Sequence, residues 1–324
     1  MADNKGRLRL FNSQREGRGV SKKDANLPPN MKKFWLLYKD NFFGRFVSIN
    51  LMMIIGNFPV IFLIMAVAGV GQGEYASPSD HMFSIFQGVM HGSGETSLSN
   101  LAWLGMGGMQ ITSNANTFWS YLFWGLGALT VFTWGLVSVG VAYILRNIAS
   151  GRPVFLLSDF FDAIRNNFKQ GFIFGIIDAI IFCIIPYNIY TMLQSGGTFM
   201  TSMLFWMNIV LYLAFLIMRW YVYLQIVSFD LPLFKMVKNA MYFILLGFKR
   251  NVMALLGSAL LIGISAFFLF ALGGRLIVIT LAIPGLILFS NSAFMHIYAA
   301  WYKIDEIMVI KGDEEAEDDE IIEE

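Results

Sequence analysis

Six long apolar segments constrain the fold of this chain more than any other feature. They cover residues 46–70, 117–145, 171–194, 200–227, 252–272 and 276–300. A helix that crosses a bilayer needs about 20 mostly apolar residues, because the hydrocarbon core is about 30 Å thick and each residue rises about 1.5 Å. The segments therefore predict an all-α, polytopic membrane protein with six transmembrane helices.

The composition supports this class of protein. Hydrophobic residues make up 56% of the chain and charged residues 14%, whereas soluble domains average about 45–50% and about 25%. The single cysteine, Cys183, excludes an internal disulfide and a cysteine-based metal cluster.

Lysine and arginine are divided unequally between the two sides of the predicted spans. Residues 1–45 contain eleven, and the loops 146–170 and 228–251 contain four each, but 71–116 and 195–199 contain none. Arg275 is the one basic residue on that second side. Because cytoplasmic loops are enriched in Lys and Arg, we expect both termini to be cytoplasmic.

The three basic stretches share one plan. Each opens near a proline, continues as an amphipathic helix, and ends with a basic residue, any residue and asparagine. These ends are Lys39-x-Asn41, Arg165-x-Asn167 and Lys249-x-Asn251, and Asp159 favours the positive start of the second helix. The plan predicts three helical hairpins, each preceded by an interfacial helix lying among lipid headgroups. One alternative is that any six-span protein shows such elbows. Another is a helix whose exposed face binds a partner.

The predicted organisation follows from this repeat. A basic, disordered cytoplasmic N-terminus covers 1–29, a six-span membrane domain covers 30–305, and an acidic cytoplasmic tail covers 306–324. The membrane domain divides into units 30–145, 146–227 and 228–304. The first unit contains an outer insertion, 71–116, in which 82–90 and 101–111 are expected to form short helices at the outer leaflet or an ordinary packed loop.

Asp178 and Arg219 are the charges that lie well inside predicted spans, each about 10–13 Å from the inner end at helical rise. Buried charges in a membrane are costly unless paired, so we expect an ion pair between neighbouring helices. A structural pair is the simpler interpretation, in which Arg219 could also reach down to the interface. The alternative is a substrate or proton site.

Prolines and asparagines inside the spans are candidate helix breaks: Asn57, Pro59, Pro186, Asn188 and Pro284. In transporters, broken helices expose backbone groups that bind solutes near the middle of the bilayer. Prolines are also common in membrane helices as simple kinks, so both interpretations stay open.

Recognisable catalytic patterns are missing from the sequence. It has no phosphate-binding loop, serine nucleophile elbow or His-Glu-x-x-His motif. His81 and His91 have no metal-ligand spacing with their acidic neighbours. We therefore predict no enzyme activity, no catalytic residue, no cofactor and no metal. The basic residues adjoin predicted headgroups, which indicates membrane lipids as partners and gives no support for nucleic-acid binding. The sequence leaves the oligomeric state undetermined.

Two stretches resemble a known family. The segments FFGRFVSINLMMIIGNFPV (42–60) and TWGLVSVGVAYILRNIASGRPVFLLSDFFDAIRNNFKQGFIFGIID (133–178) resemble the YesL-like family of bacterial integral membrane proteins of unknown function. The resemblance implies a bacterial cell membrane and, since such genes often lie near carbohydrate-uptake genes, a role beside sugar transport. It implies no functional residues.

Three functions follow as hypotheses. The first is an accessory or regulatory component associated with solute uptake, with carbohydrate as the implied class and other transport components as partners. The second is a small-solute transporter or channel that uses Asp178 and Arg219. The third is a lipid-binding structural scaffold.

Overall fold

The computed structural model describes residues 30–78, 82–94, 97–108, 110–194, 197–272 and 277–310. These residues are mostly helical and form two compact units. The larger unit contains the described residues up to Asn57 and from Val131 onwards, and the smaller unit is Phe58–Thr130. The predicted N-terminal segment 1–29, residues 311–324 of the predicted acidic tail 306–324, and His81 lie outside the described residues, whereas residues 306–310 of that tail are helical. The division into three repeated units stays a prediction.

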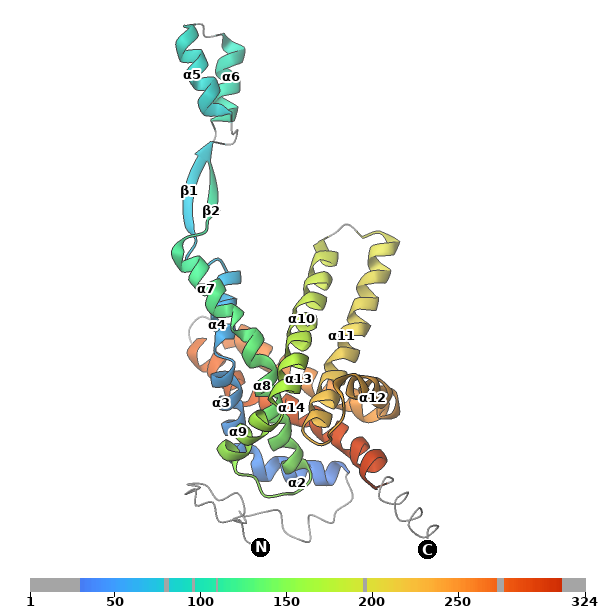
Figure 1. Ribbon diagram of the computed structural model, residues 1–324. Coiled ribbons are helices and arrows are strands. Elements are labelled where there is room, and N and C mark those ends of the chain that lie inside the picture. Colours follow the sequence, from blue (N-terminus) through green and yellow to red (C-terminus); the bar gives the residue numbers. More distant parts are fainter. Residues whose placement is uncertain are drawn as a thin grey trace, which may run out of the picture. The chain divides into compact units, whose positions relative to one another are not determined.

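The larger unit consists of helices throughout its described part (Figure 1). In chain order they are α2 (Met31–Asn41), the π-helix η1 (Phe42–Phe46), α3 (Val47–Gly56), α8 (Thr130–Ala149), α9 (Leu156–Asn166), α10 (Phe168–Gln194), α11 (Phe199–Ile226), α12 (Leu233–Leu246), α13 (Phe248–Leu272), α14 (Ile277–Ile304) and the π-helix η2 (Asp305–Ile310).

Four described helical segments are long and apolar enough to cross a membrane: Phe118–Ala149, Phe168–Gln194, Phe199–Ile226 and Phe248–Ala271. A fifth span results if Met31–Gly56 and Pro59–Val67, which meet at a bend, are counted together. The chain therefore has the helices of a membrane protein. The full set of six spans and their arrangement as hairpins stay predictions, and the side chains of α14 before Gly285 lie outside the described residues.

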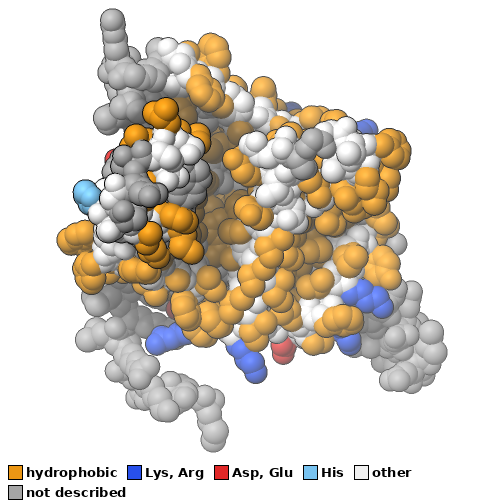
Figure 2. Space-filling view, turned by 90° about the horizontal axis from the view of Figure 1, so that it is seen from above, with side chains coloured by type: hydrophobic (Ala, Val, Ile, Leu, Met, Phe, Trp, Pro, Cys, Tyr) orange, Lys and Arg blue, Asp and Glu red, His pale blue; other side chains and the backbone are white. Residues whose placement is uncertain are grey.

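Apolar side chains face outward on these helices. On α10, Ile173, Ile177, Ile180 and Ile184 follow the helical period and are all more than 40% exposed. Figure 2 shows hydrophobic side chains over much of the visible surface, with Lys and Arg near the rim of the view. An apolar surface of this extent would be unfavourable in water, and it is typical of a surface that contacts lipid.

The core of the larger unit lies where α14 packs against α3, α11 and α13. Its fully buried side chains come mainly from α8, α11 and α14, and include Val139, Ala142, Leu145, Tyr221, Leu224, Phe294 and Ile297.

Glycines allow α8 and α10 to approach closely. A side chain at Gly135 would clash with the backbone at Gly171 and Gly175, and one at Gly175 would clash with the backbone at Gly135. Because lipid provides no hydrophobic drive between helices, membrane helices commonly pack through such small residues. The crossing brings the side chains of α8 next to those of α10.

The smaller unit contains α4 (Pro59–Val67), β1 (Gly73–Pro78), α5 (Phe83–Ser93), α6 (Leu98–Gly107), β2 (Gln110–Ala115) and α7 (Phe118–Ala128). Helix α4 packs on α7, and Gly127 faces the backbone of Leu63. The strands form an antiparallel pair in which Gly73 lies opposite Ala115 and Pro78 opposite Gln110. The short helices expected at 82–90 and 101–111 correspond to α5 and α6, although α6 ends at Gly107 and residues 110 and 111 lie in β2; the strands were not predicted.

Candidate functional site: a buried ion pair between α10 and α11

Asp178 of α10 and Arg219 of α11 form a bidentate ion pair. Arg219 Nη2 lies 2.8 Å from Asp178 Oδ2, and Arg219 Nε lies 2.9 Å from Oδ1. Asp178 is completely buried and Arg219 is 8% exposed. The forked guanidinium matches the carboxylate geometry, which makes this one of the stronger classes of hydrogen bond.

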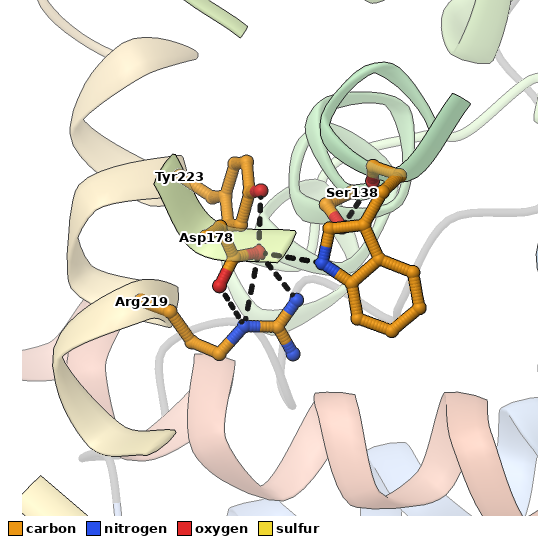
Figure 3. A network of polar contacts seen from close by, with 5 residues as sticks. Ser138, Asp178, Arg219 and Tyr223 are labelled. Atoms are coloured by element: carbon orange, nitrogen blue, oxygen red, sulfur yellow. Dashed lines mark hydrogen bonds and ion pairs between the residues drawn. The ribbon is translucent and has the colours of Figure 1, made fainter. Parts of the chain in front are cut away.

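Two more donors reach the same carboxylate (Figure 3). The Tyr223 hydroxyl donates to Asp178 Oδ2 at 2.7 Å, and the indole N–H of Trp134 in α8 donates to it at 2.9 Å. Ser138, one turn along α8, donates its hydroxyl to the Trp134 carbonyl at 2.8 Å. The carboxylate therefore links three helices, α8, α10 and α11.

Aromatic rings surround the guanidinium of Arg219. Its central carbon lies 5.0 Å from the ring centre of Trp220, 5.4 Å from that of Trp134 and 5.5 Å from that of Phe182. Cations are attracted to the faces of such rings, and more so when water is excluded. Both charges are thus surrounded by protein groups that come from α8, α10 and α11.

Asn50 of α3 is a polar residue that the sequence analysis did not single out. Its side-chain amide donates to the Gly285 carbonyl of α14, and its Oδ1 accepts from the Ser290 backbone N–H at 2.8 Å. Asn50 and Ser290 are both completely buried. The side chain thus takes part in the backbone hydrogen bonding of α14. Its position as an asparagine within an otherwise apolar predicted span could have indicated a buried polar contact.

The candidate helix breaks have different outcomes. Helix α3 ends at Gly56, Asn57 donates to the Met53 carbonyl at 3.2 Å, and α4 starts at Pro59, so the chain does break there. In contrast, α10 continues as a helix through Pro186 and Asn188 to Gln194. Of the two interpretations left open for Pro186, the continuous helix agrees with a proline tolerated within a span. A proline removes one backbone hydrogen bond, and membrane helices tolerate that loss.

The fifth candidate, Pro284, lies in the part of α14 whose side chains are not described. The backbone there is helical on both sides of the residue. Of the two residues whose backbone Asn50 contacts, Gly285 follows Pro284 directly and Ser290 lies six residues after it.

Each elbow asparagine bonds to the helix before it. Asn41 donates to the Leu37 carbonyl at 2.7 Å, and Asn167 donates to the Ala163 carbonyl at 3.0 Å. Asn251 donates to the Ile244 carbonyl at 3.1 Å and accepts from the Tyr221 hydroxyl. These bonds tie each asparagine side chain to a carbonyl near the end of a helix, and the Ala163 carbonyl also accepts the backbone N–H of Asn167.

The third elbow differs in register from the predicted repeat. Helix α9 ends at Asn166, with Asn167 as its C-terminal cap, but α12 ends at Leu246, with Gly247 as the cap. Gly247 therefore occupies the place of Asn167, and Asn251 lies in the second turn of α13. A side chain at position 247 would meet the Tyr221 hydroxyl, which explains the glycine.

Two further residues of the predicted loop 146–170, Arg146 of α8 and Gln170 of α10, donate hydrogen bonds to the segment between α11 and α12. Arg146 is 7% exposed, and its Nη1 donates to the Val227 carbonyl at 2.6 Å and to the Ser228 hydroxyl at 3.0 Å. Gln170 donates to the Leu231 carbonyl at 3.0 Å. Arg146 was counted only among the four basic residues of the predicted loop 146–170, because spacing alone does not show that it faces the protein.

Asp159 stabilises the start of α9. Its Oδ2 accepts from the Phe155 backbone N–H at 2.8 Å. Partial burial raises the pKa of Asp159, the Phe155 N–H opposes this rise, and the charge of Asp162 adds to it. Arg165, on the same helix, is exposed.

Among the described residues, no group of three or more His, Cys, Asp or Glu side chains is placed to hold a metal ion. Apolar spans and a buried, internally neutralised ion pair define the class as a helical membrane protein. Residues 97–189 match the family described as "Protein of unknown function, DUF624". The matched segment includes Trp134 and Asp178 but ends before Arg219. No curated protein and no solved structure matches the chain.

Proposed function

We propose that this chain is a six-span protein of the bacterial cell membrane, with three hairpins, elbow helices at the inner leaflet and cytoplasmic termini. The distribution of Lys and Arg supports this orientation. The exposed aromatic residues of the elbow helices support their place at the interface, where amphipathic helices bury an apolar face. They include Trp35 of α2, Phe161 of α9 and Phe234 of α12.

We further infer that the protein is an accessory or regulatory component of solute uptake, with carbohydrate as the solute class. The resemblance to YesL-like proteins supports this role, and the family match over residues 97–189 assigns no activity of its own. The role requires no catalysis and no cofactor.

One observation carries the choice of an accessory role over a transporter. The intramembrane carboxylate of Asp178 accepts hydrogen bonds from Arg219, Tyr223 and Trp134, and all three donors belong to the protein. A substrate or proton site needs a group that exchanges partners, and this group is held by several strong bonds at once. The arrangement therefore favours a rigid helix junction.

Affinity purification from the native membrane tests the role. The tagged chain is expected to retain components of a solute-uptake system after mild solubilisation, and a tagged six-span protein of unrelated sequence serves as the control. Recovery of the chain without any transport component would contradict the proposal. Solute flux through vesicles that contain this chain alone, lost on Asp178→Ala, would instead identify a transporter.

A further inference from the structure

A groove lies on the outside of the first elbow. It has a volume of about 430 Å³ and is lined by Trp35, Tyr38, Lys39, Phe42 and Phe43. All five residues belong to α2 and η1, so one continuous stretch of chain forms the whole groove.

The walls of this groove are aromatic and exposed. Ring centres lie 5.6 Å apart for Trp35 and Tyr38, 5.4 Å for Tyr38 and Phe42, and 4.9 Å for Phe42 and Phe43. Trp35 is 58% exposed and Phe43 is 88% exposed. Such a continuous apolar patch indicates an apolar ligand or surface.

The π-helix η1 explains why two consecutive phenylalanines line the groove. A π-helical turn is wider than an α-helical turn, and such turns are frequent at functional sites. The widened turn starts at Phe42, where it lets Phe42 and Phe43 extend the wall that Trp35 and Tyr38 begin.

The ammonium group of Lys39 supplies a positive charge to the lining of the groove. Lys39 is exposed and makes no ion pair among the described residues. Lys32, also exposed, lies seven residues earlier, two helical turns away on the same face of α2. These ammonium groups would repel a quaternary ammonium and would attract a phosphate. The ligand therefore carries a negative head and an apolar body.

We propose that this groove binds one anionic phospholipid of the adjoining leaflet, with Lys39 at the phosphate and the aromatic wall along the glycerol and acyl chains. The site is more specific than a general attraction of basic elbows to lipid. It is independent of the solute-uptake role, because neither depends on the other being correct.

Native mass spectrometry of the full chain in detergent tests the site, with phosphatidylglycerol and phosphatidylcholine of identical acyl chains as the probes. The wild type is expected to bind phosphatidylglycerol about tenfold more tightly, as one charge-assisted contact would give. Lys39→Gln should remove this preference and Lys39→Arg should keep it. Trp35→Ala should weaken the binding of both lipids and leave their ratio unchanged.

Lys238→Gln provides the matched control, because Lys238 is an exposed lysine on another elbow helix, α12. It should keep the full preference. If Lys238→Gln and Lys39→Gln lose the preference for phosphatidylglycerol equally, the lipid is attracted diffusely to basic residues, and the proposed site is wrong. An unchanged preference in Lys39→Gln, or no preference in the wild type, would also overturn it. Thermal unfolding of each variant checks that the fold is retained.

Discussion

Trp134 of α8 donates its indole N–H to Asp178 Oδ2 of α10 at 2.9 Å, on the carboxylate that Arg219 of α11 neutralises. The ion pair therefore does more than balance two charges between α10 and α11. It connects these two helices to α8, the helix that packs against α10 through glycines.

The ion pair should contribute strongly to stability only while both partners are present. Removing one partner of a buried pair leaves an uncompensated charge and costs about 3–5 kcal/mol. Asp178→Asn and Arg219→Gln should each lower the unfolding free energy by this order, measured by denaturant titration in mixed micelles. The double variant should lose much less than the sum of the two. Additive losses would contradict a coupled pair.

Asn50→Leu should destabilise the packing of α3 on α14. It removes the two hydrogen bonds that join Asn50 to the Gly285 carbonyl and the Ser290 N–H, and each such bond contributes about 0.5–1.5 kcal/mol. Asn208→Leu is the control, because Asn208 bonds to the Leu204 carbonyl of its own helix and its contact with α10 is a weak hydrogen bond to the Met192 sulfur at 3.8 Å. Equal unfolding free energies for the two variants would show that Asn50 contributes no more than a local bond.

Gly175→Leu should separate α8 from α10. A side chain at Gly175 meets the backbone of Gly135, which cannot move aside like a flexible side chain, and overpacking of this kind costs about 1–3 kcal/mol. Gly263→Leu in α13 is the control, because a side chain there meets nothing within 4 Å. The melting temperature should fall in the first variant and stay close to wild type in the second.

Asp159 should make a small, pH-dependent contribution. Burial raises its folded-state pKa above its ordinary value of 3.8, so the folded protein holds this proton more tightly than the unfolded chain. The resulting stability is fully present below the unfolded pKa and is lost as pH rises through the folded pKa. Asp159→Asn should therefore reduce the fall in melting temperature from acidic to neutral pH. Asp230→Asn, at an exposed aspartate, is the control variant. If the melting temperature of Asp159→Asn falls between acidic and neutral pH as much as that of the wild type, Asp159 does not make this contribution.

Hydropathy and charge predicted the features that depend on local sequence. The sequence was sufficient to predict the apolar helices, the short helices α5 and α6, and the pairing of Asp178 with Arg219. The helices follow from the spacing and length of apolar segments, and the pairing follows from the cost of an unpaired buried charge. The other residues that donate hydrogen bonds to Asp178, Trp134 and Tyr223, were not predicted. Nothing in the sequence brings Trp134 to Asp178, since the contact depends on how closely Gly135 lets two helices approach.

Other features escaped for similar reasons. Asn50 contacts Gly285 across more than two hundred residues, and no local pattern encodes such a distance. In the third elbow, Gly247 caps α12 in the place that the repeat assigned to Asn251. Asn251, four residues later, bonds to the Ile244 carbonyl from within α13. The sequence pattern does not distinguish these two registers. For Pro186 the sequence left a helix break and a tolerated proline both open, and α10 continues through the residue.

Accessibility of engineered cysteines in intact cells tests the proposed topology most directly. In a Cys183→Ser background, cysteine is placed at Arg165 in the second elbow or at Thr198 between α10 and α11, both exposed positions. A membrane-impermeant maleimide should label Thr198→Cys in intact cells and Arg165→Cys only after permeabilisation. Labelling of Arg165→Cys from outside intact cells would contradict an elbow at the inner leaflet and the orientation built on it.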